Sequence, residues 1–93
     1  MEIREDLWPV LYVRISGAVT DVGWRDMFAA YARFYAKKQR YLCITDASGL
    51  RSVPDAQARG LIASLAKVHE PDSRLWIWHS HVVFDSAIVR GAL

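Results

Sequence analysis

The feature that most constrains the fold is an apolar run at residues 41–45, Tyr-Leu-Cys-Ile-Thr, which is nearly free of polar side chains. A short run of this kind is typical of a central strand that is covered on both faces. Other β-rich runs lie at residues 10–15, which end at Ser16-Gly17, and at residues 74–79. A short first strand is expected over residues 3–7, followed by a turn at Trp8-Pro9, because proline fixes φ and lacks an N–H.

Two helices are predicted between these strands from apolar residues spaced by three and four. The first is capped by Thr20-Asp21 and runs to about Gln39, with an apolar stripe of Trp24, Met27, Phe28, Tyr31, Phe34 and Tyr35. The second opens at Pro54-Asp55 and ends at residues 70–72, with a buried face of Leu61, Ile62, Leu65, Ala66 and Val68. Residues 84–93 suggest a third helix. The order β-β-α-β-α-β-α predicts an α/β fold with a mixed, mostly parallel sheet and packed helices.

Composition narrows the class of protein. The chain has 93 residues, which fits one domain over residues 1–93, and 53% of them are hydrophobic, which indicates a globular fold. The net charge is only +2 and the basic residues are scattered, so we expect no nucleic-acid partner. No apolar run approaches the ~18 residues of a membrane span. The charged start, residues 1–6, lacks the apolar centre of a signal peptide, so a cytoplasmic location is expected.

The chemistry-bearing residues do not form a recognisable catalytic set. Cys43 is the single cysteine and lies in the apolar run, so we expect a buried structural thiol. Ser80 stands between His79 and His81, but adjacent residues of a strand face opposite ways, so neither imidazole is placed to act as its base. There is no glycine-rich phosphate loop and no nucleophile elbow. We therefore expect a protein that is not an enzyme.

Two pairs in the third β-rich run leave alternatives open. His79 and His81 point the same way on a strand and would suit a shared metal, but no further ligands complete a zinc site, so no metal or cofactor is expected. Trp76 and Trp78 share the other predicted face. They either pack beneath a helix or form an exposed aromatic anchor for a partner.

Three segments, taken in order, resemble the STAS domain, the family of sulfate-transporter cytoplasmic tails and anti-anti-sigma factors. Residues 11–17 look like its second strand and closing glycine, residues 44–50 like its strand that ends in an aspartate followed by Ser-Gly, and residues 54–65 like the start of its second helix. The resemblance implies a single STAS-like domain in a bacterial cytoplasm. It implies a non-catalytic regulatory module that binds a kinase-like anti-sigma factor or a larger signalling assembly.

The resemblance also implies a binding surface, on which we place Asp46, Ser48, Asp55, Ala56 and Arg59. In phospho-regulated members a hydroxyl residue at the start of the second helix is phosphorylated. Aligned from Asp46, those positions here read Pro-Asp-Ala-Gln over residues 54–57, without a hydroxyl. Asp55 then supplies a fixed negative charge where the family has its switch, and binding proceeds without phosphorylation at the usual site.

Other interpretations of these residues stay open. A competing alignment sets residues 46–50 on the switch motif and makes Ser48 the phosphosite. Asp55 is equally explained as a first-turn acid that suits the helix dipole, and Ser48 as a turn residue. Asp46 is explained either as a ligand-binding residue at a strand end or as a cap for the following loop.

Two other functions remain as alternatives at this point. One is a small-ligand or metal-binding domain that uses the strand ends with His79 and His81. The other is a self-associating structural subunit, because the family's last strand and helix have no counterpart after Leu93. An unprotected sheet edge is therefore expected, which a partner chain or a homodimer would cover.

Overall fold

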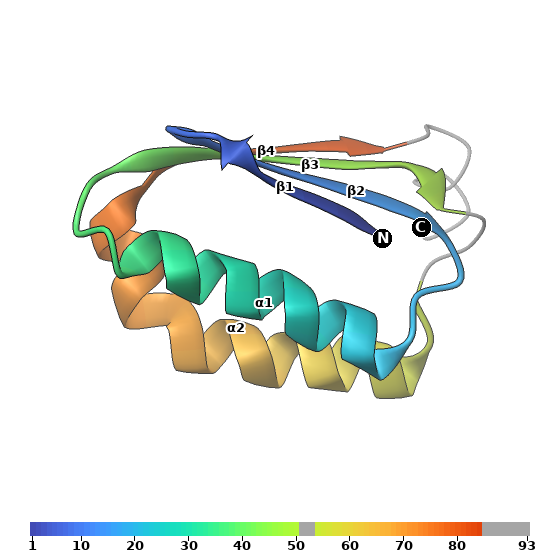
Figure 1. Cartoon of the computed structure of the whole chain (residues 1–93). Helices are drawn as coiled ribbons and strands as arrows, with labels where there is room; N and C mark the ends of the chain where they lie inside the picture. Colours follow the sequence, from blue (N-terminus) through green and yellow to red (C-terminus); the bar gives the residue numbers. More distant parts are fainter. Residues whose placement is uncertain (51–53, 85–93) are drawn as a thin grey trace.

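The computed structural model describes residues 1–50 and 54–84 and shows a small α/β arrangement of one sheet and two helices (Figure 1). In chain order the elements are β1 (Glu2–Leu7), β2 (Val10–Gly17), α1 (Asp21–Tyr35), β3 (Tyr41–Leu50), α2 (Ala56–Trp76) and β4 (Ile77–Phe84). The sheet has four strands in the order β1-β2-β3-β4. β1 is antiparallel to β2, whereas β2, β3 and β4 are parallel. The predicted mixed, mostly parallel sheet is thus confirmed.

Both helices lie on the same face of the sheet (Figure 1). Each strand joins the sheet beside the one before it, so the β2-α1-β3 and β3-α2-β4 connections step in the same direction. Right-handed connections that step in one direction place their helices on one face. The prediction that β3 is covered on both faces is therefore wrong for the described residues. Leu42 and Ile44, on the face away from the helices, are only half-buried.

The core lies between the helix-facing side of the sheet and α1. The predicted stripe of α1 is buried, apart from the half-buried Tyr31. An aromatic cluster closes one end of this core, with ring centroids 5.3 Å apart for Trp8 and Phe34 and 5.0 Å apart for Phe34 and Tyr41. Cys43 is a free, buried thiol, as predicted. The buried hydrophobic residues are Leu11, Val13, Ile15, Trp24, Met27, Phe28, Ala30, Phe34, Tyr35, Tyr41, Cys43 and Ala47, and Thr45 is buried beside them.

The start of α1 was predicted correctly and its end was not. Thr20 is the N-cap residue, and its hydroxyl accepts a hydrogen bond from the Gly23 N–H at 3.3 Å. The helix ends at Tyr35 instead of near Gln39, because the chain reverses at Lys38, which has a left-handed φ of 55°. A left-handed residue just beyond the last turn is a common way for a helix to end.

The second helix continues beyond the predicted stop at residues 70–72. α2 runs through Pro71 to Trp76, and β4 begins only at Ile77. Trp76 is therefore a helix residue and does not share a strand face with Trp78. Proline inside a helix removes its own N–H bond to the preceding turn, and its ring crowds the carbonyl one turn earlier. The turn around it is bridged by the Ser73 hydroxyl, which donates to the Glu70 carbonyl, and by the Arg74–Glu70 ion pair.

α2 is packed less deeply than its sequence pattern predicts. Leu61, Ile62 and Leu65 contact the core but stay partly exposed. Ala66 and Val68, predicted on the buried face, are exposed, and Val68 is 76% exposed. Neither described helix is long and apolar enough to cross a membrane. The third helix predicted over residues 84–93 starts wrongly, because Phe84 belongs to β4, and its remainder lies outside the described residues.

Candidate functional site

The structure places the predicted site residues in two separate groups. Asp46 and Ser48 lie within β3, whereas Asp55, Ala56 and Arg59 lie at the start of α2, in the helical layer. Asp46 pairs with Arg14 of β2 and contacts Tyr12, which lies on the sheet face away from the helices. None of the hydrogen bonds among the described residues joins the two groups. The predicted binding residues therefore come from two layers, the sheet and the helices, and no described hydrogen bond joins them into one site.

Asp46 and Ser48 form a local clasp in a β-bulge. The Asp46 Oδ1 atom accepts hydrogen bonds from the Ser48 N–H at 3.0 Å and from the Ser48 hydroxyl at 2.6 Å. The register between β2 and β3 shifts here, because Arg14 pairs with Asp46 and Ser16 with Gly49. Short polar side chains that bond the nearby backbone favour this irregularity. The sequence also predicts a loop over residues 47–53 after a strand that ends at Asp46. This is wrong for residues 47–50, because the clasp lets β3 continue to Leu50, and residues 51–53 lie outside the described residues.

The clasp also fixes the charge of Asp46. Hydrogen bonds from Ser48, first from its hydroxyl and then from its N–H, lower the pKa of the Asp46 carboxyl below its ordinary value. The Tyr12 hydroxyl donates a longer bond of 3.4 Å to Oδ2. A phosphate on Ser48 would have to replace the hydroxyl bond and stand next to an ionised carboxylate, which like charges disfavour. Phosphorylation of the exposed Ser48 stays a prediction, and this geometry opposes it.

Asp55 is the N-cap residue of α2. Its Oδ1 atom accepts a hydrogen bond from the Ala58 N–H at 2.8 Å, with the extended backbone that a cap requires. Ala56 is the first helical residue, so Pro54 precedes the helix instead of lying in its first turn. Arg59 folds back over this turn, and its Nη1 donates to the Pro54 carbonyl at 2.8 Å. An acid and a base thus flank the start of α2.

Two substitutions of Asp55 separate the stabilising effect of its capping hydrogen bond from the effect of its negative charge. Asp55→Ala should lower the free energy of unfolding by about 0.5–2 kcal/mol, because the Ala58 N–H loses its acceptor. Asp55→Asn keeps an acceptor oxygen and should cost far less. Urea unfolding followed by circular dichroism measures both variants. Equal losses for the two variants would show that the charge, and not the cap bond, supports the helix.

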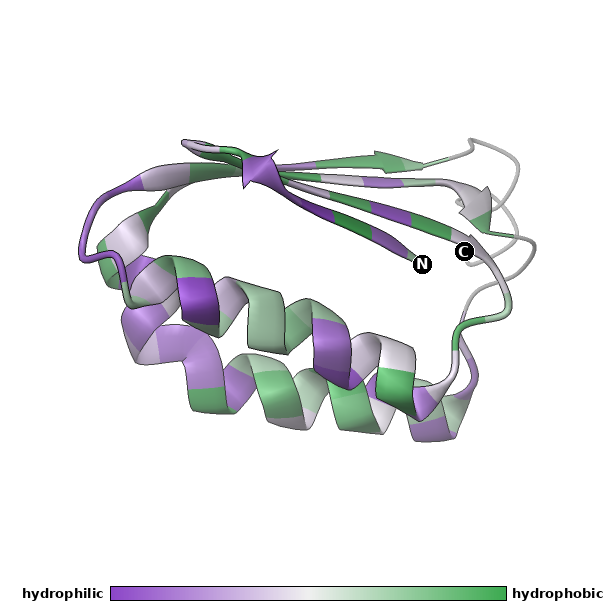
Figure 2. Cartoon of the chain, viewed as in Figure 1, coloured by the Kyte–Doolittle hydropathy of each residue, from purple (hydrophilic) through white to green (hydrophobic). Residues whose placement is uncertain are grey.

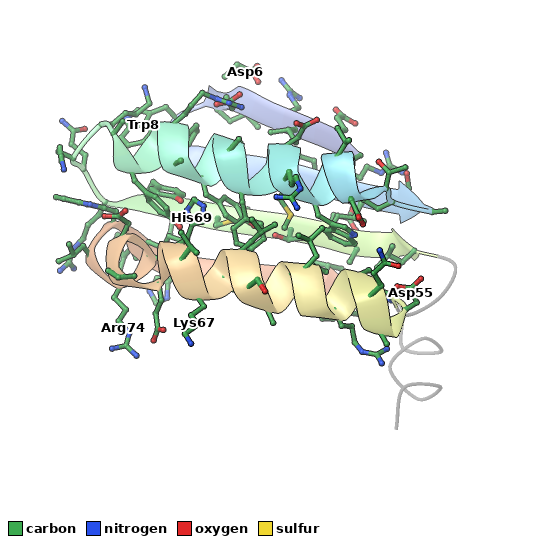
Figure 3. The ribbon with its side chains drawn as sticks, turned by 90° about the horizontal axis from the view of Figure 1, so that it is seen from below. Asp6, Trp8, Asp55, Lys67, His69 and Arg74 are labelled. Carbon is green, nitrogen blue, oxygen red and sulfur yellow. The ribbon has the colours of Figure 1, made fainter. Side chains whose placement is uncertain are left out.

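A cavity of about 200 Å³ lies beside this first turn. It is formed where β2 and β3 end and where α1 and α2 begin. Asp55, labelled in Figure 3, marks the start of α2 beside it. The carboxyl ends of parallel strands, where the following helices begin, are the usual place for binding sites in α/β folds. The described residues that line the cavity are Gly17, Ala18, Val19, Trp24, Leu50, Pro54, Asp55 and Ala58.

Trp24 is the largest side chain of the cavity wall. It is 4% exposed, and its indole N–H has no hydrogen-bond partner among the described residues. Gly17 also lines the cavity and has a φ of 65°, a left-handed value that glycine adopts without strain where β2 ends. Sequence reasoning missed this cavity. The usable signal was Ser16-Gly17, which marked the strand stop but was not considered as part of a site.

Among the described residues, the histidines and the cysteine are not grouped into a metal site or a catalytic site. The rings of His79 and His81 lie 6.0 Å apart on β4, and no cluster of three or more His, Cys, Asp or Glu residues is found in residues 1–50 and 54–84. Burial raises the pKa of the Cys43 thiol, which keeps it protonated and weakly nucleophilic. Trp78 is 63% exposed, so of the two interpretations of this residue the structure favours the exposed aromatic.

Comparisons with protein-family models, with curated proteins and with solved structures found no match for this chain.

Proposed function

We propose that this chain is a non-catalytic, protein-binding regulatory module, STAS-like in its organisation. It receives a signalling partner at the start of α2, through the cavity, Asp55 and Arg59. The observation that carries this proposal is the position of the cavity directly beside the capped first turn of α2. A partner that reached the charged turn would also reach the cavity.

The size of the cavity favours a protein partner over a cofactor. Pockets for drug-sized ligands usually measure about 300–1,000 Å³. The cavity here, about 200 Å³, is smaller and suits one side chain of a partner. Buried side chains of this kind, held in a pocket and ringed by polar contacts, carry most of the binding energy in protein interfaces. We infer an apolar side chain of the partner against Trp24.

The charged side chains beside the cavity would orient the partner. Asp55 and Arg59 are both exposed, one on each side of the first turn. Charged groups at the rim of an interface steer and orient a partner more than they add affinity. Ala56 occupies the family's switch position without a hydroxyl, so this proposal includes no phosphorylation there. By the resemblance, the partner is a kinase-like anti-sigma factor or a larger signalling assembly in a bacterial cytoplasm.

The proposal is tested by filling the cavity. Ala58→Leu places a larger side chain in the cavity wall, and Ala63→Leu makes the same change at an exposed position of α2 outside the wall. The partner is first captured with the tagged chain and identified by mass spectrometry. Its affinity for each purified variant is then measured by calorimetry. Ala58→Leu should weaken binding by about tenfold or more, which corresponds to about 1.4 kcal/mol, and Ala63→Leu should not.

Two variants that each remove one positive charge complete the test. Arg59→Gln removes a positive charge at the site, and Lys67→Gln removes one from the part of α2 that points away from α1 (Figure 3). Arg59→Gln should slow association, with a smaller salt dependence, whereas Lys67→Gln should leave both unchanged. Binding that tolerates Ala58→Leu and Arg59→Gln alike would place the partner elsewhere and overturn the proposal.

A further inference from the structure

The last strand of the described sheet has an unprotected edge. β4 follows β3 in the sheet order, and no other described strand pairs with its outer side. Its large apolar side chains are exposed, at 63% for Trp78, 48% for Val82, 49% for Val83 and 53% for Phe84. Figure 2 shows the hydrophobic colour concentrated at the end of this strand. The side chains of Trp78, Val82 and Phe84 share one face of the strand, and exposed apolar side chains gathered in this way often mark an interface.

The two edges of the sheet differ in charge. β1, the opposite edge, carries Glu2, Arg4, Glu5 and Asp6, and Arg4 and Asp6 form an ion pair. Charged side chains on an edge strand are a common defence against pairing with another chain. β4 contains no Asp, Glu, Lys or Arg from Ile77 to Phe84. Of the two edges, only β4 offers unpaired backbone groups without such a defence.

We propose that β4 pairs with β4 of a second copy, antiparallel across a two-fold axis, and joins the two sheets into one. A second copy fits this edge because a two-fold axis presents the same strand to itself. The absence of charged residues in β4 means that no like charges are brought together. Face-to-face stacking of the open sheet faces fits less well, because it would bury Arg4, Asp6 and Arg14. This inference does not depend on the proposed function, which concerns the start of α2.

The side chains of β4 are complementary to those of a second β4 when the two-fold axis passes through either of the two central residues of the strand, Ser80 or His81. Opposite residues of an antiparallel pair lie on the same face of the sheet. With the axis at Ser80, Trp78 lies opposite Val82 of the partner subunit. With the axis at His81, Trp78 lies opposite Phe84 of the partner subunit. In both registers the most exposed aromatic side chain of β4 gains an apolar neighbour, and the outward backbone groups gain hydrogen bonds.

The first test is the mass of the full chain in solution, by light scattering and sedimentation over a range of concentrations. We expect a dimer that dissociates on dilution. Val83→Lys puts a charge on the edge and should weaken the dimer by about tenfold or more. Val68→Lys makes the same substitution at an exposed valine of α2 and should leave the dimer intact. Circular dichroism confirms that both variants fold.

The second test locates the interface. In a Cys43→Ala background, which removes the native thiol that pairs with position 80, Ser80→Cys and His81→Cys each place a thiol at one of the two central axes. Paired Cα atoms there come within the 4.4–6.8 Å span that a disulfide needs. One of the two variants should form a covalent dimer on mild oxidation, and Val68→Cys should not. A chain that is monomeric at every concentration overturns the proposal. A dimer that resists Val83→Lys and forms neither crosslink overturns it as well.

Discussion

Replacing Phe34 with alanine should lower the free energy of unfolding by about 3–5 kcal/mol. Phe34 is 1% exposed and its ring joins Trp8 to Tyr41, with an edge-on contact of 71° between the Phe34 and Tyr41 rings. The change removes a large buried side chain and leaves a cavity in a small core. Domains of this size are stable by only about 5–15 kcal/mol, so the loss is a large share of the total. Urea unfolding followed by tryptophan fluorescence measures it.

Phe84→Ala is the matched control for this measurement. Phe84 is 53% exposed, so the same substitution removes little buried surface in the monomer. Both variants are compared at a concentration at which the wild-type chain is monomeric, because Phe84 lies on the proposed dimer edge. Similar losses at the two positions would show that the aromatic cluster around Phe34 is not the centre of the core.

Replacing Pro71 with alanine should raise the free energy of unfolding by about 1–3 kcal/mol. Pro71 lies inside α2, five residues before its end at Trp76. Alanine restores the missing N–H bond to the preceding turn and removes the clash of the proline ring. A gain of 1 kcal/mol corresponds to a rise in the melting temperature of about 4–8 °C for a domain of this size. Thermal unfolding followed by circular dichroism measures the shift.

Asp72→Ala controls for the general benefit of alanine in a helix, because Asp72 is the exposed neighbour of Pro71. The gain in the free energy of unfolding from Pro71→Ala should clearly exceed the gain from Asp72→Ala. A Pro71→Ala variant that is no more stable than wild type would indicate that α2 ends at residues 70–72, as the sequence pattern alone predicts.

Much of the architecture could be predicted because it depends on local periodicity. The α1 stripe and its Thr20 cap follow from spacing and from one hydroxyl, and β2 follows from a β-rich run closed by Gly17. The order of strands and helices then determines a mostly parallel sheet. Each of these patterns depends on the residues of one segment only, so it can be interpreted without knowledge of tertiary contacts.

The errors arose where two segments decide the outcome together. Asp46 looked like the end of a strand because polar residues follow Thr45, yet its bond to Ser48 carries β3 on beside β2. Leu42 and Ile44 look like residues of a doubly covered strand, but the direction of the two helical connections leaves their face open. Pro71 is a strong local stop signal that the surrounding turn overrides.

The candidate site was predictable only in part, for a related reason. Asp55 was expected near the start of α2 as a first-turn acid that suits the helix dipole, and the structure makes it the N-cap residue just before that turn. The cavity beside it is assembled from the ends of four elements, and no single motif records it. Asp46 and Asp55 are nine positions apart in sequence, but the bulge and the crossing from sheet to helix place them in different layers.

The strand order has a consequence for how the chain is made. Within residues 1–50 and 54–84, each strand after β1 pairs with the strand synthesised just before it, and none must be inserted between two that already exist. The β1–β2 hairpin can therefore form first, and each later helix and strand can dock on a finished edge as it leaves the ribosome. Until β4 is made, the growing edge is β3, so the uncharged strand is the last of the described strands to join the sheet.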